Sequence, residues 1–173
     1  MRLIAGRWRG RTLEAPPGLA TRPTSDRVRE ALFSMLASRF GSFEGLRVAD
    51  LFAGSGALGL EALSRGAAHC VFVDKDRGAI EAIRANMAAL GAAGEVLPGV
   101  AEHVRIAGPL DLAFLDPPYG SGLAAPALER LPLAPSGLAS VETERREAIA
   151  VGGFEEEAVR VYGKARITLL RRT

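Results

Sequence analysis

The sequence predicts an α/β protein built on a mostly parallel, doubly wound sheet, with an antiparallel hairpin at its C-terminal end and a basic N-terminal extension. Segments of strand length alternate with segments of helical periodicity between residues 47 and 143. The strand segments, such as Val71-Phe72-Val73, are nearly continuous in apolar residues, as in sheets that helices cover on both faces. The last two strand-like segments lie close together in the chain, which is typical of a hairpin.

The expected elements follow from these patterns in chain order. Residues 1–14 alternate loosely around two glycines and could form a hairpin. Residues from 25 to 40 carry apolar side chains at three- and four-residue spacing, which predicts a helix that Thr24 or Ser25 can cap. Strands are predicted at 47–52, 69–74, 94–98, 110–115 and 138–143, and helices at 57–65, 76–90, 100–106 and 123–131. Segments 154–162 and 165–171 are predicted to pair as antiparallel strands, and Asn86 is expected to face solvent.

The composition indicates one cytoplasmic domain, with residues 1–24 as the extension and residues 25–173 as the core. Its apolar share of 48% and charged share of 24% are ordinary for a globular protein. The sequence contains no apolar run near the roughly 20 residues that cross a bilayer, and no signal-peptide core. The single cysteine excludes an intramolecular disulfide, and the two histidines lie away from cysteines and paired acids. We therefore expect no metal site, and we also expect a monomer.

Positive charge is concentrated at the start of the chain. Residues 1–49 carry a net charge of +5, and residues 50–173 carry −3. Most of the basic residues are arginines, which form bidentate contacts with phosphate. The extension is therefore predicted to face nucleic acid. Its candidate RNA-binding residues are Arg7, Trp8, Arg9, Arg11 and Arg22. Trp8 could equally pack the N-terminal hairpin onto the domain.

A glycine-rich loop follows the strand predicted at 47–52. Gly54, Gly56 and Gly59 form a G-x-G-x-x-G pattern at the start of a helix, where glycine permits tight turns and close approach of a ligand. Asp74 ends the next strand, 20 residues after Gly54, at a spacing that suits a carboxylate bound to ribose hydroxyls. The loop predicts a nucleoside site, but it does not distinguish a dinucleotide from S-adenosylmethionine. The candidate cofactor-binding residues are Asp50, Phe52, Ala53, Gly54, Ser55, Gly56, Asp74 and Lys75.

The motif Asp116-Pro117-Pro118-Tyr119 follows the strand predicted at 110–115 and indicates the chemistry. Proline fixes φ and removes N–H donors, so this loop offers acceptors. The Asp116 carboxylate and a proline carbonyl can accept hydrogen bonds from the two N–H groups of an exocyclic amine, while Tyr119 stacks on the base. Two fixed acceptors would aim the lone pair of the amine at a methyl group, and Asp116 can take the released proton. The four residues are therefore candidate catalytic residues for methyl transfer from S-adenosylmethionine.

With both motifs placed, the sequence resembles the RsmD family of methyltransferases, which modify guanine N2 in bacterial small-subunit ribosomal RNA. The resemblance rests on Gly6-Arg7-Trp8-Arg9-Gly10-Arg11, on residues 22–33, on the loop from Asp50 to Gly56 and on the Asp116–Tyr119 motif. It implies a Rossmann-like, class I S-adenosylmethionine-dependent methyltransferase fold. It also implies 16S rRNA as substrate, in the small ribosomal subunit or its assembly intermediate. One departure is that residues 98–101 carry no acid directly after the third strand, where such enzymes often have one; Glu102 comes slightly later.

Three alternatives remain from the residues alone. An adenine-N6 DNA or RNA methyltransferase would use the same Asp-Pro-Pro-Tyr motif. A nicotinamide-dependent oxidoreductase would use the glycine loop but would leave that motif unexplained. A non-catalytic RNA-binding assembly factor is disfavoured by the two intact motifs.

Overall fold

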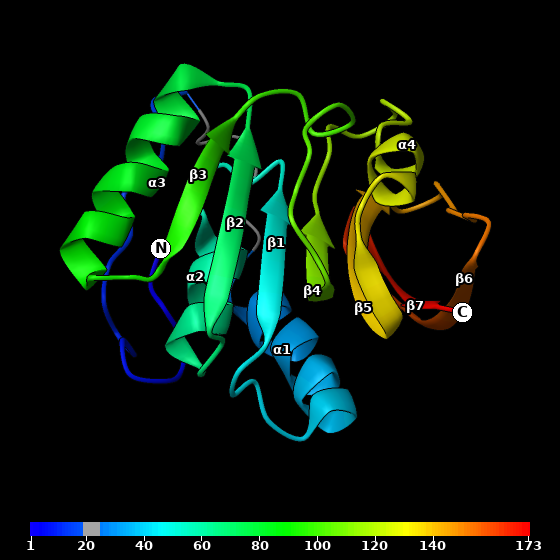
Figure 1. Cartoon of the computed structure of the whole chain (residues 1–173), viewed down its shortest axis with the longest axis horizontal. Helices are drawn as coiled ribbons and strands as arrows, with labels where there is room; N and C mark the ends of the chain where they lie inside the picture. Colours follow the sequence, from blue (N-terminus) through cyan, green and yellow to red (C-terminus); the bar gives the residue numbers. More distant parts are fainter. Residues whose placement is uncertain (19–24) are drawn as a thin grey trace.

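The computed structural model describes residues 1–18 and 25–173 (Figure 1). Arg22 and Thr24, for which the sequence predicts an RNA contact and a helix cap, lie outside the described residues. The central feature is a seven-stranded sheet in the order β3-β2-β1-β4-β5-β7-β6. Its strands are β1 (Arg47–Leu51), β2 (His69–Asp74), β3 (Gly94–Pro98), β4 (Leu110–Leu115), β5 (Leu133–Glu144), β6 (Phe154–Tyr162) and β7 (Ala165–Arg172).

Strand directions confirm the predicted sheet and its terminal hairpin. Strands β1 to β5 pair in parallel, and β7 pairs antiparallel with both β5 and β6. The chain moves outward from β1 to β3 and then returns to β4 on the other side of β1. This reversal of strand order is a topological switch, where open α/β sheets bind ligands at the carboxyl ends of their strands.

Helices cover both faces of the sheet. One face carries α1 (Asp26–Phe40), α2 (Ala57–Ser64) and α3 (Arg77–Leu90), and the other carries α4 (Ala124–Glu129). Alternating strand residues supply the two cores, because successive side chains point to opposite faces. Phe72 of β2 packs with the first group of helices, whereas Leu51 of β1 packs with α4. The side chains of the two cores determine how close each helix packs to the sheet. In the part of the chain that the structure describes, no helix is long and apolar enough to span a membrane.

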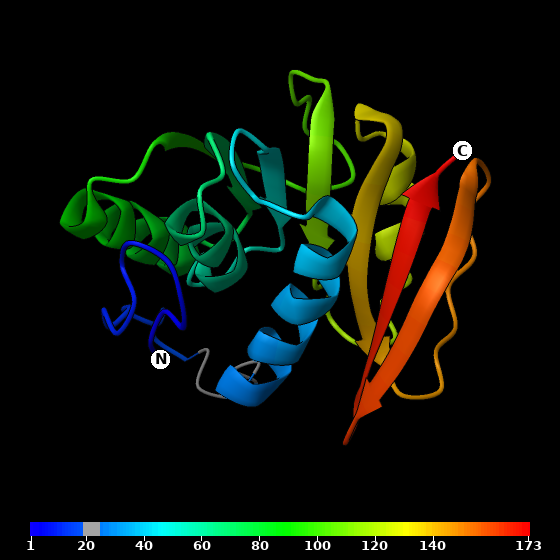
Figure 2. The same ribbon diagram turned by 90° about the horizontal axis from the view of Figure 1, so that it is seen from below.

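The N-terminal segment, residues 1–18, packs on the same face as α1 (Figure 2). Its hairpin is rudimentary, with one antiparallel bridge between Arg2 and Thr12. Of the two predicted roles of Trp8, the structure supports packing, because the side chain is only 8% exposed. The RNA-stacking role predicted for Trp8 is therefore corrected: its ring lies in the core, under the guanidinium of Arg7 at 4.2 Å.

Local predictions fare unevenly at the element ends. Ser25 caps α1 as predicted, since its hydroxyl accepts a hydrogen bond from the Val28 amide. The helix predicted at 100–106 is wrong: this segment forms a single turn, in which Val100 accepts hydrogen bonds from His103 and Val104. The segment lies between Gly99 and Gly108, and its apolar residues Ala101, Val104 and Ile106 pack into the core beside α4 without a helix. Strand β5 also begins five residues before the predicted 138–143.

Candidate active site

The carboxyl ends of β1, β2 and β4 meet at the switch point. In the register, Leu51 at the end of β1 lies between Val73 of β2 and Leu115 of β4. Asp74 and Asp116 come directly after these two partners and therefore flank the start of the glycine loop. The structure thus brings together the two motifs that the sequence places more than 40 residues apart.

The glycine loop has an unusual backbone geometry, with three of its residues at positive φ. Gly54 and Gly56 have φ values of 60° and 81°, a left-handed region that glycine enters without steric cost. Phe52 has a φ of 59°, which is uncommon for a residue with a side chain and is often found near functional sites. The Gly56 amide donates to the Ala53 carbonyl at 2.8 Å, which closes the turn before α2.

Asp74 is fixed by the same loop. Its Oδ2 accepts a hydrogen bond from the Gly54 amide at 2.9 Å, and its Oδ1 accepts one from the Asp76 amide at 2.9 Å. Each carboxylate oxygen has more than one acceptor site, so both can also accept from a ribose hydroxyl. Lys75 follows on the exposed surface.

Asp50 supports the loop from below. Its side chain on β1 is buried, and its Oδ2 accepts a hydrogen bond from the Gly59 amide at 2.9 Å. Burial raises the pKa of Asp50 well above its ordinary range, and the carboxylates of Asp116 and Asp74 raise it further. Asp50 therefore orients the first turn of α2 rather than offering an exposed group to a ligand. The carboxylates of Asp74 and Asp116 give this edge of the sheet a negative field.

The Asp116–Tyr119 loop is braced from β5 and the segment after it. Pro117 is buried, whereas Tyr119 is partly exposed and its hydroxyl donates to Oε1 of Glu142 at 2.9 Å. The Gly120 amide donates to Oε2 of Glu147 at 3.2 Å. An open pocket of about 500 Å³ adjoins this loop. It is lined by Tyr119, Gly120, Glu144, Arg146 and Glu147.

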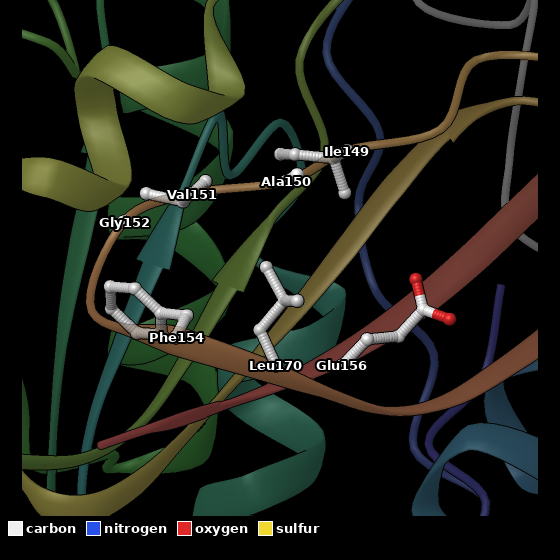
Figure 3. Close-up of a pocket in the computed structure, with 7 residues that line it drawn as sticks. All are labelled: Ile149, Ala150, Val151, Gly152, Phe154, Glu156 and Leu170. Carbon is white, nitrogen blue, oxygen red and sulfur yellow. The ribbon is translucent and has the colours of Figure 1, made fainter.

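A second pocket is lined by residues other than Asp50, Asp74 and Asp116. It has a volume of about 350 Å³ and is formed by the segment after β5 together with β6 and β7 (Figure 3). Its lining residues are Ile149, Ala150, Val151, Gly152, Phe154, Glu156 and Leu170. The set includes none of the predicted site residues.

The predicted RNA-contacting arginines do not lie at the cofactor loop. Arg7, Arg9 and Arg11 are exposed, and the Arg7 amide donates to the carbonyl of Ser64 at the end of α2. Because α2 begins at the loop and has eight residues, this contact lies about 12 Å from the loop along the helix.

The contacts of two polar residues near the site, Asn86 and Glu142, were missed by the sequence analysis. The prediction that Asn86 faces solvent is wrong: the side chain is 3% exposed and bonds to Ser55 and Glu14. Its position three residues after the buried Ile83 on one helix face is the signal that could have found it. The corresponding signal for Glu142 is that it is an acidic residue within a largely apolar predicted strand, directly after Val141.

These residues fit S-adenosylmethionine. Asp74 can accept from the ribose hydroxyls, the left-handed glycines let a ligand approach the backbone, and the negative field suits a cation. In the described residues, no group of three or more histidine, cysteine or acidic side chains could hold a metal ion. The fold and the site together define an S-adenosylmethionine-dependent methyltransferase.

Comparison with known proteins places the chain within this class. It belongs to the family described as Conserved hypothetical protein 95, whose model matches residues 1–171. The chain is 41% identical over 151 residues to "Ribosomal RNA small subunit methyltransferase D" of Escherichia coli, covering 83% of this chain and 75% of that one. It is 44% identical over 126 residues to "Putative rRNA methyltransferase YlbH" of Bacillus subtilis, covering 69% and 67%. The solved structure "Putative methyltransferase yhhF from Escherichia coli" superposes with a TM-score of 0.87 at 36% identity, covering 99% and 97%.

Proposed function

We propose that this methyltransferase acts on the exocyclic N2 amine of a guanine in 16S rRNA, within the small ribosomal subunit or its assembly intermediate. The observation that carries the proposal is the Asp116–Tyr119 loop, which lies beside the glycine loop at the switch point. The names of the relatives support ribosomal RNA as the substrate. We further propose that residues 1–173 work as one domain and as a monomer in the cytoplasm.

The chain's own residues would position the amine and remove its proton. The Asp116 carboxylate accepts a hydrogen bond from one N–H group of the amine, and a carbonyl of Pro117 or Pro118 accepts one from the other. These two hydrogen bonds direct the nitrogen lone pair toward the methyl group. Bound S-adenosylmethionine supplies an electrophilic methyl group, whose bonding electrons stay with the sulfur when the new N–C bond forms. Asp116 then accepts the proton that the methylated nitrogen loses.

Tyr119 provides the stacking surface, and Glu142 holds it in place. The hydrogen bond from the Tyr119 hydroxyl to the buried Glu142 restricts the ring before the base arrives. Tyr119→Ala should lower kcat/KM for RNA by about 10- to 100-fold, since stacking contributes about 1–3 kcal/mol per base. Tyr119→Phe should lower it by a smaller factor, because the ring remains but its anchor is lost. Equal losses in the two variants would refute the stacking role.

The substrate can be tested directly. Unmodified small subunits, naked rRNA and duplex DNA are offered with labelled donor, and the products are digested and analysed as nucleosides by mass spectrometry. We expect N2-methylguanosine, with the small subunit as the best substrate. N6-methyladenine, or higher activity on DNA, would overturn the proposal in favour of an adenine methyltransferase.

A variant at the loop separates chemistry from cofactor binding. Asp116→Ala should lower the rate by about 10²–10⁴-fold, because a positioned base is lost. Calorimetry should show nearly unchanged affinity for S-adenosylhomocysteine. Failure of this variant to bind S-adenosylhomocysteine would instead place Asp116 in the cofactor site.

A further inference from the structure

Asn86 joins three separate segments of the chain through a single buried amide. It lies on α3, and none of its side-chain hydrogen bonds goes to its own helix. Its Oδ1 accepts from the Glu14 amide at 2.8 Å. Its Nδ2 donates to the Glu14 carbonyl at 3.0 Å and to the Ser55 carbonyl at 2.9 Å. The side chain therefore connects the N-terminal segment to the glycine loop.

The pattern of donors and acceptor requires an amide at this position. An aspartate has nearly the same shape but cannot donate, and it would face two carbonyl oxygens. An apolar residue would fill the space but leave the backbone groups of Glu14 and Ser55 without these partners, at a cost for each buried group. A polar residue on the buried face of α3 is thus explained by its contacts and not by core packing.

The Ser55 contact controls one peptide of the cofactor loop. The Ser55 carbonyl and the Gly56 amide belong to the same planar peptide. The amide end is held by the Ala53 carbonyl at 2.8 Å, and the carbonyl end is held by Asn86. Glycine on either side of Ser55 would otherwise allow this peptide to rotate, because glycine restricts φ and ψ so little.

The other end of the bridge is itself anchored near the site. After Glu14 the chain passes the first turn of α3, where a Cβ on Gly78 would lie 3.6 Å from Cδ of Pro17 and 3.9 Å from Cβ of Pro16. The Ser55 hydroxyl also lies 3.9 Å from the sulfur of Met1. The N-terminal segment therefore packs on the first turn of α3 and meets the loop at Ser55, and the Asn86 side chain connects the two through its hydrogen bonds.

We propose that Asn86 is a positioning residue for the S-adenosylmethionine site: it fixes the Ser55–Gly56 peptide against the backbone of the N-terminal segment. This inference rests on the proposed cofactor but not on which base is methylated. Loss of the contact should raise the cost of ordering the loop when the cofactor binds. The effect should fall on cofactor affinity and leave the methyl-transfer step intact.

The test compares Asn86→Asp and Asn86→Ala with the control Ser64→Ala. Ser64 is also buried and also bonds to the N-terminal segment, through the Trp8 amide and the Ala5 carbonyl, but it does not contact Ser55. Calorimetry measures the Kd for S-adenosylhomocysteine, and hydrogen exchange measures protection of the Gly56 amide without ligand. Circular dichroism measures the melting temperature of each variant, and all other measurements are made at a temperature where every variant is folded. Asn86→Ala, which buries no new charge, keeps the test valid if Asn86→Asp does not fold.

We expect binding to weaken by about 2- to 10-fold in the Asn86 variants, since one hydrogen bond contributes about 0.5–1.5 kcal/mol, and we expect faster Gly56 exchange. KM for S-adenosylmethionine should rise by the same factor, with kcat within about twofold of wild type. Ser64→Ala should lower the melting temperature but keep the wild-type Kd. Unchanged Kd and exchange in both Asn86 variants, or an equal loss in Ser64→Ala, would overturn the inference. If wild-type protein fails to bind S-adenosylhomocysteine, the proposed function itself is wrong.

Discussion

Gly59→Ala tests whether α2 must lie this close to the sheet for the cofactor loop to form. A Cβ at Gly59 would lie 2.5 Å from Cε1 of Phe72 and 2.6 Å from Sγ of Cys70. Carbon atoms pack at about 3.5–4.0 Å, so the helix would have to move by about 1 Å. Both neighbours are buried in β2, so they have little room to yield.

The expected magnitude follows from two opposing effects. Overpacking of a core costs about 1–3 kcal/mol, while alanine gains about 1 kcal/mol over glycine in a helix. A shift of about 1 Å would also strain the hydrogen bond of 2.9 Å from the Gly59 amide to the buried Asp50. The two effects leave a net loss of about 0–2 kcal/mol, and strain in this hydrogen bond adds about 1 kcal/mol, so we expect the free energy of unfolding to fall by about 1–3 kcal/mol. Binding of S-adenosylhomocysteine should weaken by about tenfold.

Urea unfolding and calorimetry measure the two effects. The matched control is Gly152→Ala, because a Cβ at Gly152 meets no atom within 4 Å and its φ is not left-handed. That substitution should change the free energy of unfolding by less than about 0.5 kcal/mol. If Gly59→Ala behaves like the control in both assays, close packing of α2 on β2 does not shape the loop.

Three further predictions concern charges. Asp74→Ala should weaken S-adenosylhomocysteine binding by about 10- to 100-fold, as hydrogen bonds to charged groups contribute about 1.5–3 kcal/mol; an unchanged Kd in calorimetry would place the ribose elsewhere. Replacing Arg7, Arg9 or Arg11 by glutamine should lower the salt slope of RNA binding by about 0.7–0.9 per phosphate contact; a retained slope would move the RNA footprint to another face. Because the pKa of Asp50 is raised in the folded protein, the folded state binds more protons, and stability should fall as pH rises through the window between the unfolded and folded pKa. Asp50→Asn should remove this pH dependence in urea unfolding, and identical profiles would contradict a raised pKa.

The sequence by itself determined the features that depend on neighbouring residues. The strands at 69–74, 94–98 and 110–115 were predicted at their observed bounds, because apolar runs of strand length are local patterns. Ser25 was identified as a possible cap from its place before a periodic segment. The glycine loop and the Asp116–Tyr119 motif were also readable, since each consists of consecutive or closely spaced residues.

Only the tertiary structure decided contacts between segments far apart in the chain. Asn86 bonds to Glu14 across 72 residues, and Tyr119, in the loop after β4, bonds to Glu142 on β5. A polar residue in a helix has the same local pattern whether it faces water or a backbone partner, because the partner belongs to a different segment. The packing that buries Trp8 is likewise set by which surfaces meet. Burial and hydrogen-bond partners depend on the assembled fold, so local patterns identified the motifs, whereas the tertiary structure determined which residues hold them in place.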